Sequence, residues 1–270
     1  MDFIAKPFGV LMKFIYETLA FENYGIAIII FSIFVRLLML PLNIKQQRSM
    51  ERQQALMPEI EALKKQYKND PKKLQEEQAM LYSRHQINPY SGCLPMLLQY
   101  PLIIVVYQII RQPLTYIAQF SADQISKFAT QFSLPVMDEI SINSKLSEIN
   151  MNFLGIFDLG ETPRFDFWNW GAEWKIFLPL LLIPILSLAT AYLQQHITTK
   201  LSSAGQTTAG SMGCMMKVMP LMSLAFGFML PAGVGLYWIM GNVLGIAQTL
   251  LIKKVFAPKK EGSDVYGKIN

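Results

Sequence analysis

The chain has 270 residues, of which 52% are hydrophobic and 16% are charged, and its formal net charge is +5. Soluble domains carry about 25% charged residues, so this chain has too little polar sequence to coat a soluble core. The composition excludes an ordinary soluble domain and predicts an integral membrane protein.

The first 22 residues show the spacing of an amphipathic helix. Lys13 and Glu17 fall on one face of that helix. The apolar face comprises Phe8, Leu11, Met12, Ile15 and Leu19. The pattern predicts an interfacial helix over residues 1–22 that lies flat on the outer leaflet. The alternative is a helix that packs against the protein's own outer region.

Five apolar segments reach the length of about 20 residues that a membrane-spanning helix needs. They are residues 23–42, 93–111, 176–195, 212–230 and 234–253. The alternative for the shorter segments is a buried core helix, which the shortage of polar sequence around them argues against. The sequence therefore predicts an all-α membrane protein with five transmembrane helices in a single membrane-embedded domain.

Basic residues are divided unevenly between the predicted loops. Residues 43–92 contain nine lysines and arginines, whereas residues 112–175 contain four, together with eight acidic residues. Cytoplasmic loops carry the excess of Lys and Arg, so residues 43–92, the loop 196–211 and the basic tail 254–270 are predicted to be cytoplasmic. The N-terminus and residues 112–175 are then extracellular. Cys93 and Cys214 fall near cytoplasmic ends of spans, so free thiols are expected.

Residues 43–92 have the pattern of a charged helical hairpin. One helix is predicted to run to about Tyr67 and a second to start at Pro71, with Asp70 as its N-cap. The hairpin is interpreted either as a docking arm for a nascent chain or partner, or as a solvated connector. The basic residues assigned to docking are Arg48, Arg52, Lys64, Lys65, Lys72 and Lys73.

Arg36 lies inside the first apolar segment. A guanidinium keeps its proton in proteins, and placing it at the bilayer centre costs about 2.5–3.5 kcal/mol. The five predicted spans contain no Asp or Glu. We therefore expect the counter-charge of Arg36 to arrive with a substrate. The alternative is that its side chain snorkels to the cytoplasmic headgroups.

Polar side chains recur at helical spacing in three of the predicted spans. They are Ser32 beside Arg36 in the first, Ser187, Thr190 and Gln194 in the third, and Tyr237, Trp238, Asn242 and Gln248 in the fifth. Any one stripe is explained by hydrogen bonds between neighbouring helices. Three stripes together with an arginine favour a shared polar cavity. Gly241 and Gly245 are interpreted as a pair that permits close helix packing.

Motifs for nucleotide binding and for hydrolysis are missing from the sequence: it has neither GxxxxGK[ST] nor HExxH. His85 and His196 have no neighbours at metal-ligand spacing. We expect no cofactor, no metal site and no enzymatic activity. The alternative function is a membrane transporter or channel, although no internal repeat supports it.

Four stretches carry a resemblance to a known family. They are residues 35–42 (VRLLMLPL), 88–101 (NPYSGCLPMLLQYP), 219–222 (MPLM) with Phe226, and 231–238 (PAGVGLYW). These stretches resemble the YidC membrane insertases, relatives of the mitochondrial Oxa and chloroplast Albino proteins. The second stretch is the most specific, because both its pattern of Pro and Gly residues and its position at the entry to a span match the family. The resemblance covers about residues 3–255 and is to the short bacterial form, without a large periplasmic domain.

The resemblance implies a hydrophilic groove that is open to the cytosol and to lipid and closed toward the outside. It implies that Arg36 is the groove arginine, that Gln194 or the adjacent Gln195 is the polar position on the third span, and that Trp238 is the aromatic position on the fifth. The groove residues expected from the stripes and the resemblance together are Ser32, Arg36, Thr190, Gln194, Gln195, Tyr237, Trp238 and Asn242.

The function implied is the insertion and folding of newly made membrane proteins in the bacterial cell membrane, driven by partitioning of the substrate into lipid and not by ATP. The expected partners are nascent membrane-protein substrates and the lipid bilayer. The ribosome and the Sec translocon are further candidates, and no specific nucleic-acid partner is expected.

Overall fold

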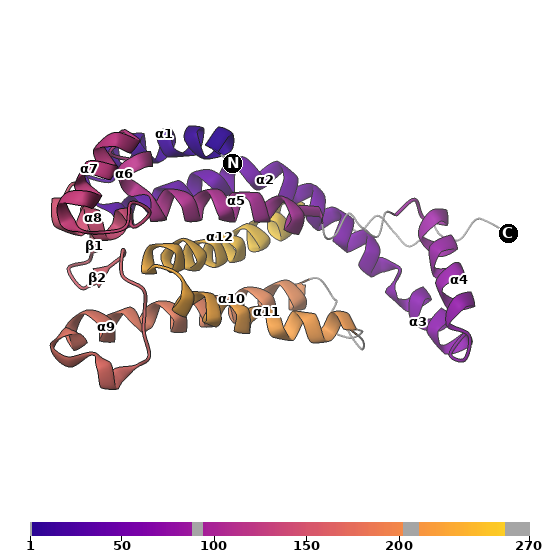
Figure 1. The fold of residues 1–270 in the computed structure, drawn as a ribbon. Coiled ribbons are helices and arrows are strands. Elements are labelled where there is room, and N and C mark those ends of the chain that lie inside the picture. Colours follow the sequence, from indigo (N-terminus) through magenta and orange to yellow (C-terminus); the bar gives the residue numbers. More distant parts are fainter. Residues whose placement is uncertain (1, 88–93, 202–210, 257–270) are drawn as a thin grey trace.

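The computed structural model describes residues 2–87, 94–201 and 211–256, and these residues are mostly helical. Long helices run side by side, a group of short elements gathers at one end, and a helical hairpin projects at the other (Figure 1). The helices are α1 (Asp2–Thr18), α2 (Tyr24–Ala55), α3 (Met57–Gln66), α4 (Pro71–Arg84), α5 (Leu94–Arg111), α6 (Pro113–Tyr116), α7 (Ala122–Phe132), α8 (Glu139–Leu146), α9 (Trp174–Leu180), α10 (Leu182–Leu201), α11 (Ser211–Met229) and α12 (Ala232–Phe256).

Some sequence predictions fall outside the described residues. They are Cys93 and the first six residues of the 88–101 motif, most of the loop 196–211, nearly all of the tail 254–270, and the side chain of Cys214.

Three helical stretches are long and apolar enough to cross a membrane: Tyr24–Gln53, Trp174–Leu201 and Ala232–Lys254. Shorter apolar helices occupy Pro101–Arg111 and Pro220–Met229, within the second and fourth predicted spans. Large apolar side chains on these helices, such as Leu37 and Leu251, are exposed. This exposure would be unfavourable in water and suits contact with lipid.

The first span does not end as a helix where its apolar run ends. α2 continues for 32 residues, through Pro41, to Ala55. The segment after Leu42 is rich in Gln, Arg, Lys, Met and Glu, which are good helix formers, and nothing there stops the helix. The first helix predicted for the hairpin is therefore partly an extension of the span, and only α3 is separate from it.

The third predicted span consists of two helices, α9 and α10, which meet at Leu181. Pro184 stands in the first turn of α10, where its missing N–H has no intrahelical partner to lose. The two helices still form one apolar stretch.

Residues 113–161, here called the cap, form the group of short elements at one end of the molecule (Figure 1). The cap contains α6, α7 and α8 and a two-stranded antiparallel sheet, in which β1 (Asn152–Phe153) pairs with β2 (Phe157–Asp158). The turn between the strands places Leu154 and Gly155 at positive φ, 57° and 74°. The prediction of an all-α protein is thus wrong in this detail. Strands of two residues are too short for an alternation of apolar and polar side chains to be visible in the sequence.

The cap is fastened to the ends of two spanning helices through the backbone of residues 149–161. Tyr24 N–H donates to the carbonyl of Asn150 at 3.1 Å, and Ala232 N–H donates to that of Glu161 at 2.8 Å. These bonds satisfy N–H groups that the first turn of a helix leaves without partners. The cap therefore closes the N-terminal ends of α2 and α12.

Glu139 joins α8 to α6 inside the cap. Its side chain is buried, and its Oε2 accepts the backbone N–H of Thr115 at 2.9 Å. Burial raises the pKa of the Glu139 carboxyl above its ordinary value, and the hydrogen bonds from Thr115 and Leu114 offset only part of that rise. Ionised Glu139 is thus less favourable in the folded cap than in the unfolded chain.

We expect the cap to lose stability as the pH rises above the ordinary glutamate pKa of about 4.3 and through the raised value of Glu139. The Glu139→Gln variant keeps the shape of the side chain but cannot ionise, so this part of the pH dependence should vanish in it. Hydrogen-exchange protection of residues 114–116, measured across this range, checks the prediction. Glu148→Gln, at an exposed position, is the control. Equal pH profiles for wild type and Glu139→Gln would contradict the prediction.

α1 packs on the protein, against α2, α5 and α6. Met12 and Ile15 are buried, and the Phe8 ring meets Phe31 of α2 edge to face at 6.0 Å. The apolar face seen in the sequence is therefore the packed face, except for Leu19, which is exposed.

The hairpin of α3 and α4 has a small core of its own, formed by Leu56, Ile60 and Leu81. The Asp70 side chain accepts the backbone N–H of Lys73 at 3.1 Å, and Pro71 is the first residue of α4. The predicted helix start and its cap are confirmed.

Candidate functional site: a polar pocket between three helices

Arg36 lies on the part of α2 that faces α12. Its side chain is half-buried, and its Nη2 donates a hydrogen bond to the carbonyl of Gly241 on α12. None of the ion pairs found among the described residues includes Arg36. The guanidinium is thus held in place by a backbone dipole, and its charge is not neutralised by a paired carboxylate.

A cavity of about 220 Å³ opens beside Arg36. α2, α10 and α12 each contribute to its wall, and all of its lining residues except Leu201 and Gly245 are polar. They are Arg36, Asn43, Gln46, Gln47 and Glu51 from α2, Gln194, Thr198 and Leu201 from α10, and Gly245, Gln248 and Thr249 from α12. We call this cavity the polar pocket.

The lining residues recur at helical spacing. On α2, Arg36, Asn43, Gln47 and Glu51 fall at i, i+7, i+11 and i+15, which is one face of a helix. Arg36 and Glu51 are about 22 Å apart along the helix axis. The polar pocket therefore follows α2 from the apolar segment toward the end that carries the basic hairpin. Asn43 Nδ2 donates to Gln248 Oε1 at 3.3 Å and links α2 to α12 along this path.

Two of the residues expected in a groove line the polar pocket, Arg36 and Gln194. The adjacent Gln195 is not among the lining residues, so Gln194 is the member of the pair that faces the pocket. Gln194 lies against α12 at Gly245, beside Arg36.

Thr190 and Asn242 lie one turn away from the pocket and join α10 to α12. Asn242 Nδ2 donates to Thr190 Oγ1 at 3.1 Å. Ser32 is buried, and its hydroxyl donates to the carbonyl of Ile28 in its own helix at 2.6 Å. Thr190 and Asn242 thus link α10 to α12, Ser32 bonds within its own helix, and none of the three is among the residues that line the pocket.

Trp238 belongs to the contact between α12 and α11. Its Nε1 donates to Ser223 Oγ at 3.0 Å, and its ring lies 5.7 Å from that of Phe226. Tyr237 is buried in the main apolar core. Trp238 and Tyr237 are therefore not among the residues that line the pocket, although Tyr237 interacts electrostatically with Arg36.

Sequence reasoning missed the pocket residues at the far end of α2: Asn43, Gln46, Gln47 and Glu51. The signal was present, because the helical repeat that starts at Arg36 continues through them. It was overlooked because the span was expected to end at Leu42. Thr198 was missed for the same reason, since it continues a polar stripe beyond the predicted end of its span at residue 195, whereas Thr249 lies within the fifth predicted span, next to Gln248.

The basic residues assigned to docking lie on α2, α3 and α4. Lys64 and Lys65 are exposed in the last turn of α3. Lys73 lies over the ring of Tyr67, with Nζ 5.4 Å from the ring centroid. Arg48 and Arg52 are exposed on α2, near the pocket residues Gln47 and Glu51.

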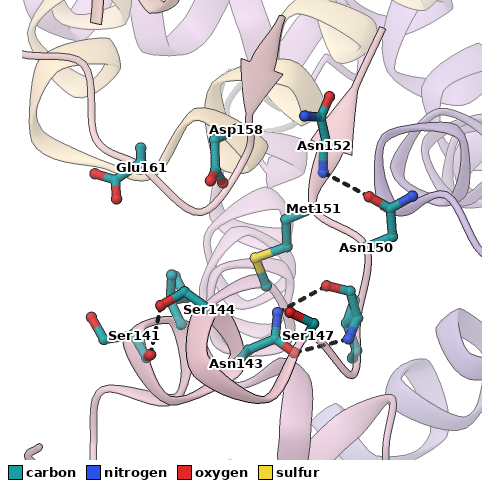
Figure 2. A pocket seen from close by; sticks show the side chains of 11 residues that line it. Ser141, Asn143, Ser144, Ser147, Asn150, Met151, Asn152, Asp158 and Glu161 are labelled. Carbon is teal, nitrogen blue, oxygen red and sulfur yellow. Dashed lines mark hydrogen bonds between the residues drawn. The ribbon is translucent and has the colours of Figure 1, made fainter. Parts of the chain in front are cut away.

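A second cavity, of about 390 Å³, lies in the cap. Figure 2 shows asparagine and serine side chains along one side and the carboxylates of Asp158 and Glu161 on the other. Asn143 is buried, and its amide makes two hydrogen bonds of 2.9 Å with the backbone of Ile149. Asp158 Oδ1 accepts the N–H of Gly160 at 3.0 Å. These groups brace the loop that closes α2 and α12, so we assign the cavity a structural role.

The fold and the polar pocket define an α-helical membrane protein with a cationic recess among its spanning helices. The sequence model of the family described as "60Kd inner membrane protein" matches residues 14–260. The chain belongs to this family.

Relatives with curated names agree with this assignment. The chain is 31% identical to "Membrane protein insertase YidC 2" of Bacillus anthracis, over 97% of this chain and 85% of that protein. It is 32% identical to "Membrane protein insertase MisCA" of Bacillus subtilis, over 93% of this chain and 78% of that protein. "Membrane protein insertase YidC" of Pelodictyon phaeoclathratiforme is 33% identical, but the alignment covers only 37% of that longer protein. The resemblance inferred from the sequence motifs is confirmed, and these relatives are named as insertases and not as enzymes.

Proposed function

We propose that this chain, a membrane protein insertase of the bacterial cell membrane, receives the polar end of a client in the pocket beside Arg36 while the client's apolar helix enters lipid. The observation that carries the proposal is the charge of Arg36. It is held among apolar helices by the Gly241 carbonyl and pairs with no carboxylate in the ion pairs found among the described residues.

The proposed topology has five spans, formed by α2, α5, α9 with α10, α11 and α12. The excess of Lys and Arg in residues 43–92 supports a cytoplasmic hairpin and an extracellular cap. With this orientation the polar pocket faces the cytosol and the cap covers the outer ends of α2 and α12. α1 would lie at the outer leaflet, with its exposed Phe3, Val10 and Phe14 in contact with lipid.

The mechanism follows from the cost of moving polar groups through hydrocarbon. A client's short polar tail must cross the bilayer, and a hydrated recess that reaches Arg36 shortens the dry part of that path. An acidic tail gains Coulomb attraction from the guanidinium, which is stronger there than in bulk water because the surroundings are less polar.

Burial of the client's apolar helix supplies the free energy, at about 25 cal/mol for each Å² of apolar surface removed from water. No nucleotide is then required. The client must also leave, so its contacts with the pocket are expected to be weak. The lining suits weak contacts, because amide and hydroxyl groups form hydrogen bonds that are worth only about 0.5–1.5 kcal/mol net.

Membrane-protein clients and the bilayer are the partners that follow from this function. We also propose that the exposed lysines and arginines of the hairpin dock a cytoplasmic partner that delivers clients, for which the ribosome and the Sec translocon are the candidates. Exposed cations on a projecting arm support this role, because they raise the rate of encounter with an acidic partner.

The test is insertion of a small single-span client with an acidic tail into liposomes that contain the purified protein. Protection of the tail from added protease reports its translocation. We expect protection well above that in empty liposomes, without added nucleotide. Equal protection in the two kinds of liposome would overturn the proposal. Passage of small solutes without client insertion would favour a channel or transporter.

A further inference from the structure

Two glycines of α12, one helical turn apart, lie beside Arg36 in different ways. A Cβ added to Gly241 would meet only Arg36 Nη2, at the ordinary contact distance of 3.8 Å. A Cβ added to Gly245 would overlap Gln194 Nε2 and would lie 3.1 Å from both Gln194 Cδ and Arg36 Nη2.

The space at Gly245 does not serve the usual purpose of a small residue in a membrane helix. Such residues let the backbones of two helices approach each other. Around Gly245 the three nearest atoms all belong to the ends of the polar side chains of Gln194 and Arg36. Gly227 shows the contrast, because an added Cβ there would meet the Cα and Cβ of Pro184.

We infer that Gly245 is a positioning residue of the insertase pocket. Its missing side chain leaves the space in which the Gln194 amide and the Arg36 guanidinium lie together against α12. The inference rests on the proposed function and adds to it the residue that sets the position of the charge.

A methyl group at this position has a defined effect. Gln194 must swing away, since its overlap with the new Cβ is the larger one. Arg36 must move by a few tenths of an ångström from the place where it bonds the Gly241 carbonyl. Both side chains are flexible at their ends, so the helices can stay packed while the charge is displaced.

The experiment uses the full chain in liposomes and two clients, one with an acidic tail and one in which the tail carboxylates are replaced by amides. Gly245→Ala should lower insertion of the acidic client by about fivefold, the scale of coupling between residues in contact. Insertion of the neutral client should fall by a smaller factor, because its tail carries no charge for Arg36 to attract. The matched control is Gly235→Ala on the same helix, where the new Cβ would overlap Ile183 of α10, away from the pocket. This control should affect both clients alike.

A second comparison distinguishes displacement of the Gln194 and Arg36 side chains from a general packing defect. In the Gln194→Ala background the deepest overlap is gone, so Gly245→Ala should cost the acidic client less than it costs in the wild type. An equal loss for both clients, or an equal loss in both backgrounds, would overturn the inference while leaving the proposed function in place. If the wild type inserts neither client above empty liposomes, the proposed function fails and the inference fails with it.

Discussion

Insertion of a client with an acidic tail should fall about tenfold when Arg36 is replaced by alanine, which corresponds to about 1.4 kcal/mol of lost interaction. The reason is the position of the guanidinium, which is half-buried beside a cavity lined by amides and hydroxyls. Arg36→Ala leaves that cavity polar but removes its positive charge. The insertion assay in liposomes, with tail protection as the readout, gives the magnitude.

Arg36→Lys separates charge from hydrogen-bond geometry in the same assay. Lysine keeps the positive charge but lacks the planar fork of the guanidinium. We expect it to retain most of the insertion, because the proposed attraction to the tail depends on charge. A client with an uncharged tail should be nearly indifferent to both substitutions. If Arg36→Ala inserts the acidic client as well as the wild type does, the polar pocket acts through hydration alone and the charge is not part of the mechanism.

The Gly227→Ala variant should be strongly destabilised. α11 passes α10 so closely that a Cβ at Gly227 would lie 2.7 Å from Pro184 Cβ and 2.8 Å from Pro184 Cα. Backbone and proline ring atoms cannot turn aside as the end of a flexible side chain can. The clash should therefore cost at least the upper part of the range of about 1–3 kcal/mol found for overpacked cores. Thermal unfolding in detergent, followed by loss of monodisperse protein, checks the prediction.

Gly241→Ala is the matched stability control, because it also places an alanine within a spanning helix but meets no atom closer than 3.8 Å. Alanine is the better helix former by about 1 kcal/mol, so this variant should be at least as stable as the wild type. If Gly227→Ala melts at the same temperature as Gly241→Ala, α10 and α11 do not pack as tightly as their glycine contact indicates.

The central residue of the pocket was predictable because its signal is local. A charge within an apolar run is visible without any knowledge of the fold, and Arg36 needed no partner to be found. Gln194 was visible as part of the polar stripe of the third predicted span, but the resemblance left a one-residue ambiguity with Gln195. Only the packing of α10 against α12 determines which of the two faces Gly245.

Other parts of the structure depend on contacts between segments that are distant in the chain. The hydrogen bonds of Tyr24 to Asn150 and of Ala232 to Glu161 join residues more than about 70 positions apart. The periodicity of apolar residues within a helix gives no sign of such bonds. The groove position of Trp238, expected from the polar stripe and the resemblance, stays a prediction. In the structure its indole N–H donates to Ser223 of α11, a contact between two helices that no local pattern in the sequence pairs.

The unbroken course of α2 has a mechanical consequence. A single helix carries Arg36 and, about 30 Å further along its axis, the junction at Leu56 where the hairpin begins. The helix is continuous along this distance, but Pro41 removes one of its backbone hydrogen bonds between Arg36 and the hairpin. Because a helix bends most easily at an internal proline, a displacement of the hairpin is expected to tilt α2 about Pro41, about one and a half turns from Arg36, and to change the depth at which the guanidinium sits.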